Sequence, residues 1–328
     1  MFRKGHRIGR ILLHRELASC IPKRSLSTTT TVISIALGIP LGMYTYKSVM
    51  MVLFQNKIIY MPYLPPGARH ETEIPKASTN YYFRKEKLQT IDNCTLEGIS
   101  IANKEEEERK PNQVLVYFHG NAGNVSHRFP VFNTILRALP DTTIVSFNYR
   151  GYGGSTGSPS EQGLQQDSVC ILSYVQKKFP NSRVILYGHS LGGAVAAYLT
   201  HQVETNPTEV NHVVGLILEN TFTSITGMVY HLYPAWLPYR YLTKWFLWNR
   251  WDTDTLMKQI HRTPVLILTS ERDAIVPTEM MNTLWESLEP NESFNRSKIV
   301  KFPYGTHEDT FKQPGFKKEI RDFVNSIR

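Results

Sequence analysis

Cysteine is scarce in this chain of 328 residues, which contains only Cys20, Cys94 and Cys170. Three widely separated cysteines cannot build a disulfide scaffold, and they offer no Cys-x-x-Cys pair for zinc or redox chemistry. Hydrophobic residues make up 41% of the chain, which excludes an intrinsically disordered or collagen-like protein. The length suggests one large domain or two of ordinary size.

Acidic residues are also few, with 28 Asp and Glu against 37 Lys and Arg, so the formal net charge is +9. Residues 1–30 account for six of these nine charges, because they hold seven Lys and Arg and a single Glu. The pI of about 9.3 is typical of nucleic-acid-binding proteins. The body is nearly neutral, however, and carries no recognisable binding motif, so we expect no nucleic-acid partner.

Residues 1–30 form a basic leader that combines Arg with Ile and Leu and ends in a Ser/Thr-rich stretch. Few acids together with many Arg, Ser and Thr are typical of a mitochondrial targeting segment. The same residues also fit the cytosolic basic flank of a membrane anchor. The sequence therefore allows either the mitochondrion or the endoplasmic reticulum as the location of the protein, and we favour the mitochondrion.

Residues 31–54 form a long apolar run that predicts a single transmembrane helix, since about 20 residues span a bilayer. Gly38, Pro40 and Gly42 are tolerated in membrane helices, and Lys47 can extend toward the interface. A partly buried amphipathic helix is the alternative. Positive charge is heavier before the run than after it, which places the N-terminus in the cytosol or matrix and the body across the membrane.

The remaining chain divides into a Pro-rich linker at residues 55–79 and a domain at residues 80–328. Short apolar runs alternate with helical patterns in this domain, which predicts an α/β fold with a mostly parallel sheet covered on both faces. The predicted strands are residues 81–88, 95–102, 114–118, 143–147, 183–187, 213–218, 265–268 and 298–302. The predicted helices are residues 129–138, 161–178, 192–202, 278–288 and 316–327.

A Gly-His-Ser-Leu-Gly sequence at residues 188–192 follows a predicted strand and opens a predicted helix. This is the context of a nucleophile elbow, in which a sharp turn raises the serine hydroxyl above the sheet. The glycines leave room where side chains would collide with neighbouring backbone. We therefore predict Ser190 as the nucleophile.

A serine hydroxyl needs a base, and in this kind of fold the acid and the histidine follow the serine in chain order. Asp273 comes just after the strand at residues 265–268, and His307 follows the last predicted strand behind a glycine turn. We predict Asp273 as the acid and His307 as the base. Glu271 and Asp309 are rival acids that we interpret as surface charges.

The loop HGNAGN at residues 119–124 follows another strand end and is rich in glycine. Such a loop can direct backbone N–H groups toward a developing oxyanion. We predict donors at the N–H groups of Leu191 and Asn121, with Ala122 as the alternative to Asn121. His119 is interpreted as a brace for this loop, and Arg150 in the next glycine-rich turn as part of a structural ion pair.

Taken together, the segments HGNAGN, NYRGYGGSTGSPSEQGLQQD, YGHSLGGAVA, ERDAIVP and GTHED resemble the α/β-hydrolase superfamily. They resemble most closely its bud-emergence-type (Bem family) membrane-anchored serine hydrolases. The resemblance covers about residues 55–328 and implies an eight-stranded sheet with Ser190, Asp273 and His307 as the triad. The resulting acyl-enzyme mechanism requires no metal and no organic cofactor.

Residues 221–262 are rich in aromatic side chains and are expected to form a cap, with four of the five Trp between Trp236 and Trp251. These aromatics either line an acyl pocket or contact a membrane, or they form the core of the cap itself. We expect a membrane-anchored serine hydrolase that cleaves an acyl or lipid-like ester or thioester. A catalytically idle membrane scaffold or polarity factor and a serine peptidase are the alternatives.

Overall fold

The structure is a computed structural model that describes residues 27–70, 80–104, 111–206, 213–237, 239–290 and 292–327. The predicted leader therefore lies outside the described residues except for its last four positions, as do residues 71–79 of the predicted linker. The chain divides into two compact units, with the boundary between Val49 and Met50.

Helix α1 (Thr28–Leu53) covers the predicted transmembrane run except for its last residue, Phe54, and begins three residues earlier than expected. Its 26 residues correspond to about 39 Å at the rise of an α-helix, more than the thickness of a bilayer core. None of its residues is buried. By length and apolar composition this helix can cross a membrane.

Eight strands form one sheet in the order β1-β2-β4-β3-β5-β6-β7-β8. Strands β1 and β2 are joined antiparallel, as are β2 and β4, and the other neighbours are parallel. The predicted fold is confirmed, with strand ends that differ from the prediction by at most two residues. The strands are β1 (Tyr81–Gln89), β2 (Thr95–Asn103), β3 (Gln113–Phe118), β4 (Thr142–Phe147), β5 (Arg183–His189), β6 (Val213–Glu219), β7 (Val265–Ser270) and β8 (Lys298–Phe302).

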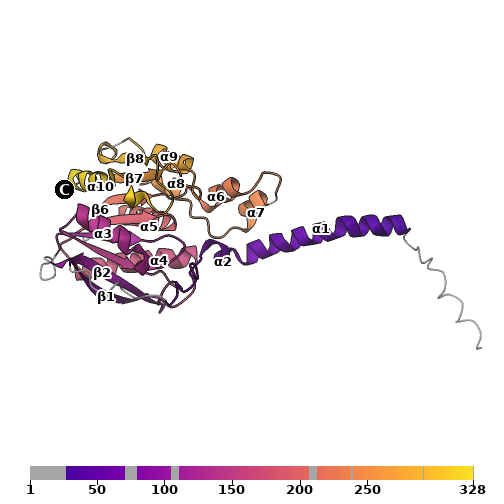
Figure 1. Cartoon of the computed structure of the whole chain (residues 1–328), viewed down its shortest axis with the longest axis horizontal. Helices are drawn as coiled ribbons and strands as arrows, with labels where there is room; N and C mark the ends of the chain where they lie inside the picture. The colour runs from indigo at the N-terminus through magenta and orange to yellow at the C-terminus, as the bar shows by residue number, and fades with distance from the viewer. Residues whose placement is uncertain are drawn as a thin grey trace, which may run out of the picture. The chain divides into compact units, whose positions relative to one another are not determined.

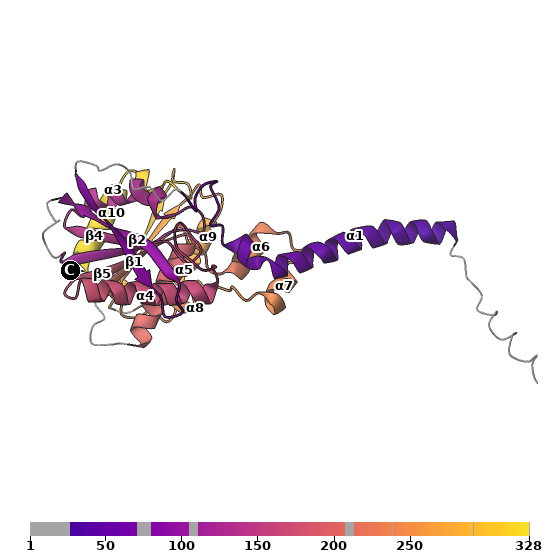
Figure 2. The ribbon, with the colours of Figure 1, turned by 90° about the horizontal axis from the view of Figure 1, so that it is seen from below.

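Each face of the sheet is covered by helices that bury one of two hydrophobic clusters. Val114, Val116 and Phe118 of β3 join one cluster, and the intervening Leu115 and Tyr117 join the other, as the two-residue period of a strand requires. Figures 1 and 2 show the helices around the sheet. On one face lie α3 (Phe129–Ala138) and α10 (Phe316–Ser326), and on the other α4 (Glu161–Lys178), α5 (Leu191–Thr205), α8 (Thr253–Met257) and α9 (Thr278–Glu286).

Two further helices, α6 (Ile225–Leu232) and α7 (Tyr239–Phe246), follow β6 within the region expected to form the cap. Ser224 caps α6, because its hydroxyl accepts the N–H of Gly227 at 3.0 Å. Helix α7 buries Tyr239 and Thr243, whereas its Tyr241 and Trp245 side chains are exposed. The two helices lie after the carboxyl end of β6, where ligands bind in sheets of this type.

The predicted linker differs from the structure between residues 55 and 70. This stretch contains helix α2 (Gln55–Ile59), and the side chains of Gln55, Tyr60 and Ala68 are buried. Met61 also forms a β-bridge with Ala122 of the glycine-rich loop. Residues 55–70 are therefore packed against the hydrolase domain, held by polar contacts with residues distant in the sequence.

Arg150 occupies the turn after β4, and the predicted ion pair is confirmed. Its guanidinium contacts Asp167 of α4 at 2.7 Å and Asp92 of the β1–β2 turn at 2.6 Å. The Asp167 side chain is fully buried. Because an isolated buried carboxylate is costly, this pair ties the turn firmly to α4.

Candidate active site

Ser190 lies at the junction between the end of β5 and the start of α5, with φ 54° and ψ −121°. A positive φ is strained for a residue other than glycine, and such residues gather at functional sites. The surroundings hold the strain in place: the Ser190 N–H donates to Glu219 at 2.9 Å, and its carbonyl accepts the Thr221 hydroxyl at 2.7 Å. The serine therefore sits in a rigid elbow.

The two glycines of the elbow are required by the surrounding backbone. A Cβ on Gly192 would lie 2.0 Å from the carbonyl oxygen of Phe118, and one on Gly188 would lie 2.2 Å from the carbonyl oxygen of Gly192. Backbone atoms cannot move aside as a flexible side chain could. The sharp turn that displays Ser190 thus depends on both glycines.

His307 and Asp273 are brought together from the loops that follow β8 and β7. The Nδ1 atom of His307 lies 2.7 Å from Oδ2 of Asp273, and both side chains are nearly buried. The other oxygen of Asp273 accepts the N–H groups of Ile275 and Val276, at 2.8 and 2.9 Å. The carboxylate is thereby oriented from both sides.

The rival acids lie elsewhere. Asp309 accepts the N–H of Thr306 at 2.6 Å and so stabilises the turn that carries His307. Glu271 is exposed at the end of β7. Neither takes the position beside the His307 ring that Asp273 occupies.

His189, the residue before Ser190, supports the loop of His307. Its Nε2 atom lies 2.8 Å from the His307 carbonyl oxygen, and the two imidazole rings are 4.9 Å apart. The Asn220 amide donates to the same carbonyl at 3.1 Å. Burial lowers the pKa of His189, which favours the neutral ring. Sequence reasoning missed both residues, although His189 stands at a variable position of the elbow motif.

Arg128 and Glu308 form a second tie between the loops, which the sequence pattern did not reveal. The Arg128 guanidinium contacts the Glu308 carboxylate at 2.5 Å and donates to the Ala122 carbonyl at 3.2 Å. Although burial acts to raise the pKa of Glu308, the charged Arg128 guanidinium beside it lowers this pKa below its ordinary value. The histidine loop and the glycine-rich loop are thus joined by an ion pair.

Of the two predicted oxyanion donors, Asn121 lies in the glycine-rich loop and Leu191 is the first residue of α5. Within the described parts of the chain, neither the Leu191 N–H nor the Asn121 N–H donates to a protein acceptor. Asn121 itself is fixed, because its carbonyl accepts the Met61 N–H at 3.0 Å and its amide donates to Ile59 at 3.2 Å. Asn121 and Leu191 both line the cavity beside Ser190, whereas Ala122 does not.

His119 braces the same loop, as predicted. Its Nδ1 atom lies 2.8 Å from the Gly120 carbonyl oxygen, and its ring packs 4.3 Å from that of Tyr149. The side chain is fully buried, and burial lowers its pKa to about 3. His119 is therefore neutral, and it contacts neither Asp273 nor Glu271.

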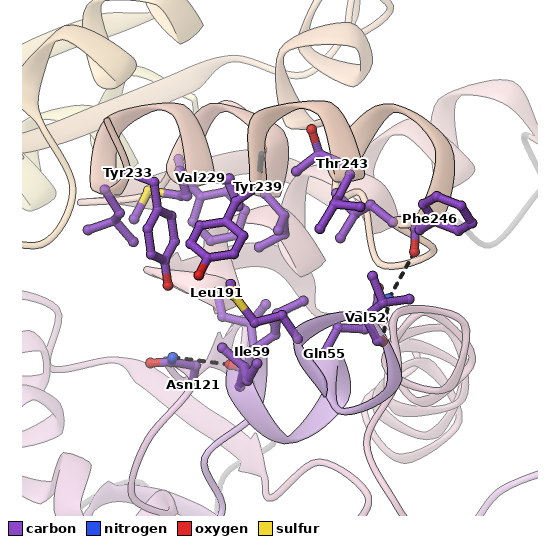
Figure 3. A pocket seen from close by; sticks show the side chains of 18 of the residues that line it. Val52, Gln55, Ile59, Asn121, Leu191, Val229, Tyr233, Tyr239, Thr243 and Phe246 are labelled. Atoms are coloured by element: carbon purple, nitrogen blue, oxygen red, sulfur yellow. Dashed lines mark hydrogen bonds between the residues drawn. The ribbon is translucent and has the colours of Figure 1, made fainter. Parts of the chain in front are cut away.

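A cavity of about 220 Å³ opens above Ser190. Its floor contains Ser190, Leu191 and Asn121, and its walls are almost wholly apolar. Figure 3 shows the cap helices on one side of this space and the turn between α1 and α2 on the other. The space can hold an apolar chain whose end lies at the serine.

His189, His307 and Glu308 also form a cluster whose potential metal-ligating atoms lie within 4.8 Å of one another. Each of these side chains already has a protein partner: His189 bonds to a carbonyl, His307 to Asp273 and Glu308 to Arg128. The cluster is accounted for by the support of the histidine loop, and we assign it no metal.

The fold and the geometry of the site agree with the known proteins that this chain resembles. A family profile described as the alpha/beta hydrolase fold matches residues 113–237. Together with the sheet order, this match defines an α/β-hydrolase. Protein bem46 of Schizosaccharomyces pombe is 36% identical over 274 residues, which cover 83% of this chain and 86% of bem46. The chain belongs to the Bem family of α/β-hydrolases.

Other relatives carry more specific names. The uncharacterized membrane protein YNL320W of Saccharomyces cerevisiae is 34% identical over 83% of this chain and 89% of its own length. The lysophosphatidylserine lipase ABHD12 of Danio rerio is 30% identical over 68% of this chain and 60% of the lipase. Among solved structures, an alpha-beta hydrolase from Vibrio vulnificus shares the fold, with a TM-score of 0.58 at 22% identity over 74% of this chain and 81% of its own.

Proposed function

We propose that this protein is a membrane-anchored serine hydrolase that cleaves an acyl or lipid-like ester or thioester. The observation that carries the proposal is the position of Ser190, in a strained elbow on the floor of an apolar cavity. The 2.7 Å contact between His307 and Asp273 supports the same assignment. Catalysis of this type needs a nucleophile, an oriented base and an oxyanion site.

In the proposed mechanism, His307 takes the proton of the Ser190 hydroxyl while the oxygen attacks the acyl carbonyl. Asp273 holds the imidazole in one tautomer and stabilises its charged form. The N–H groups of Leu191 and Asn121 donate to the oxyanion of the tetrahedral intermediate. The protonated His307 then gives its proton to the leaving alcohol or thiol, and the acyl group remains on Ser190.

Water completes the reaction in the same site. His307 takes a proton from a water molecule, whose oxygen attacks the acyl-enzyme. The second tetrahedral intermediate uses the same two oxyanion donors. Its collapse returns the proton to Ser190 and releases the carboxylic acid. Every proton passes through His307, so this histidine needs a fixed orientation toward Asp273.

The cavity supports an apolar acyl group as the substrate. Side chains such as Val229, Leu242 and Leu247 of the cap line it, and most of its other lining residues are apolar as well. Burial of apolar surface favours such a ligand by roughly 0.8 kcal/mol for each methylene group. The name of the ABHD12 relative, a lysophosphatidylserine lipase, supports a lipid-like substrate as well.

Membrane anchoring is proposed from helix α1, which has the length and apolar composition of a membrane span. The name of the YNL320W relative, a membrane protein, agrees with it. The cap adds a second feature, since Trp236, Trp245 and Trp248 are exposed aromatic side chains. Aromatic residues of this kind favour membrane–water interfaces.

Hydrolysis of a series of p-nitrophenyl esters tests the proposal. We expect the purified full-length chain to cleave long-chain acyl esters with a higher kcat/KM than the acetyl ester, because only long chains fill the cavity. Ser190→Ala lowers kcat by at least about 10³-fold for every ester. A marked preference of the wild type for the acetyl ester contradicts the proposed substrate class.

A further inference from the structure

The juxtamembrane segment, residues 51–61, forms one wall of the cavity above Ser190. Met51 and Val52 of the last turn of α1 line the cavity, and Ile58 and Ile59 of α2 continue the same wall. Helices α6 and α7 of the cap form the opposite wall, as Figure 3 shows. All of these residues belong to the unit that begins at Met50. The helix that carries the candidate membrane span thus also contributes side chains to the acyl site.

Gln55 joins this wall to the cap through its side-chain amide. The amide nitrogen donates to the Phe246 carbonyl at 3.0 Å, where α7 ends, and to the Val52 carbonyl at 3.1 Å. The amide oxygen accepts the N–H groups of Trp248 and Asn249, at 3.0 and 3.3 Å. Gln55 is only 5% exposed. A buried amide with its polar atoms paired in this way holds its partners in one geometry.

Asn249 and Asn56 extend the connection between the segment and the cap. The Asn249 amide donates to Asn56 at 2.6 Å, and its oxygen accepts the Tyr60 hydroxyl at 2.9 Å. The indole of Trp251 donates to the same hydroxyl at 3.0 Å. Asn249, Tyr60 and Trp251 are each about 1% exposed. The network is therefore buried, and it crosses from one wall of the cavity to the other.

The end of the segment also reaches the oxyanion loop. Ile59 and Met61 are bonded to the side chain and the carbonyl of Asn121, as described above. One short stretch of chain thus contacts the cap through Gln55 and the proposed oxyanion donor through Ile59 and Met61. This arrangement gives the segment influence over the width of the acyl site close to the reacting carbonyl.

We propose that the juxtamembrane segment is the element that sets acyl-chain preference, and that Gln55 is its positioning residue. Met51, Val52, Ile58 and Ile59 contact the acyl chain, and Gln55 acts through the cap by fixing the distance between the two walls. The proposal rests on the proposed ester hydrolysis. It assigns the end of the candidate membrane span and the residues just after it a part in substrate selection as well as in attachment.

Substitution of Val52 tests whether the juxtamembrane segment contacts the acyl chain. Val52→Trp fills the cavity, and we expect the ratio of kcat/KM for a palmitoyl ester to that for an acetyl ester to fall at least about 10-fold, the scale set by one methylene in a tight pocket. Leu53→Trp is the matched control, since Leu53 is the next residue of α1 and is 59% exposed. This control keeps the wild-type ratio. An equal fall in both variants, or in neither, overturns the proposal.

Substitution of Gln55 tests the positioning role. Gln55→Leu removes every hydrogen bond to Phe246, Trp248 and Asn249 at similar size, and we expect the same ratio to fall through a higher KM for the palmitoyl ester. Lys57→Leu, an exposed position of α2, retains the wild-type ratio. A proportional loss for both esters in Gln55→Leu shows a structural role alone and overturns the assignment of Gln55.

A binding measurement separates this inference from the proposed reaction. Ser190→Ala chains with and without Val52→Trp are titrated with a fluorescent long-chain fatty acid in the same detergent. We expect the Kd to rise at least about 10-fold with Val52→Trp and to stay unchanged with Leu53→Trp. An unchanged Kd in Val52→Trp overturns the inference whether or not the wild type hydrolyses esters. Conversely, the expected rise in Kd without any ester hydrolysis removes only the proposed function.

Discussion

At the scale of single residues, His119 has an environment that excludes a charged imidazole. The ring is fully buried next to Tyr149 and Tyr152, and its pKa lies near 3 because of burial. In the unfolded chain the same side chain has a pKa of about 6.5. Protonation below pH about 6.5 therefore stabilises the unfolded chain and leaves the folded protein unchanged down to pH about 3.

We expect His119→Phe to flatten the pH dependence of stability. Between pH 7.5 and 5.0, the linkage at this residue lowers the free energy of unfolding of the wild type by about 2 kcal/mol, and the variant lacks this contribution. Above pH 7.5 the residue is neutral in both states and contributes no slope. Urea unfolding in detergent at the two pH values measures the difference. Parallel pH profiles for the wild type and the variant contradict it.

The residues of the proposed triad could be predicted from the sequence because each carries a local signal. Ser190 stands in a glycine-framed motif, and Asp273 and His307 follow strand ends. Their supports were not accessible in the same way. Arg128 and Glu308 are 180 residues apart in the chain, so no local pattern pairs them. The placement of such partners depends on the folded loops.

At the scale of helices and strands, the sheet was predictable because its strands are short apolar runs. The interior strands β3 and β4 are buried throughout, and such runs separated by helices specify a parallel sheet. The first and last residues of the elements were harder to predict. Helix α5, for example, begins at Leu191, one residue before the predicted start. Element ends depend on hydrogen bonds that hydrophobic periodicity does not report.

The segment after α1 shows where sequence patterns can give a wrong prediction. Proline-rich, polar residues between 55 and 79 are typical of a linker, yet Gln55 and Tyr60 are buried. Their partners Phe246 and Asn249 lie about 190 residues further along the chain. A buried polar residue is easily predicted to be solvent-exposed when its hydrogen-bond partners are distant from it in the sequence.

The aromatic cap also combines the alternatives that its sequence left open. Tyr233 and Tyr239 line the cavity, and Trp251 is buried in the core beside Tyr60. Trp245 is 74% exposed and belongs to neither group. Composition alone could not assign these roles, because aromatic side chains serve pockets, cores and interfaces equally well.

At the scale of the whole molecule, the basic leader and most of the apolar helix are expected to determine where the protein is located. Six of the nine net charges lie in residues 1–30, ahead of α1. We expect a tagged full-length chain to reside in mitochondria and to resist alkaline carbonate extraction. A chain lacking residues 1–30 loses the mitochondrial address and keeps its membrane integration.

Fluorescence imaging with organelle markers and carbonate extraction measure these two properties separately. Retention of the full-length chain in the endoplasmic reticulum contradicts the mitochondrial address. Release of the protein into the carbonate supernatant contradicts the membrane span. Neither result concerns Ser190, so the address and the chemistry are tested independently.

The central claim is that Ser190 is a nucleophile activated by His307 and Asp273. The most direct test is labelling of the full-length chain with a fluorophosphonate probe, followed by mass spectrometry of the modified peptide. We predict a single adduct on Ser190 that is lost in Ser190→Ala, slowed at least about 10²-fold in His307→Ala, and unchanged in the control Ser173→Ala on the exposed face of α4. Equal labelling of the wild type and Ser190→Ala contradicts the claim.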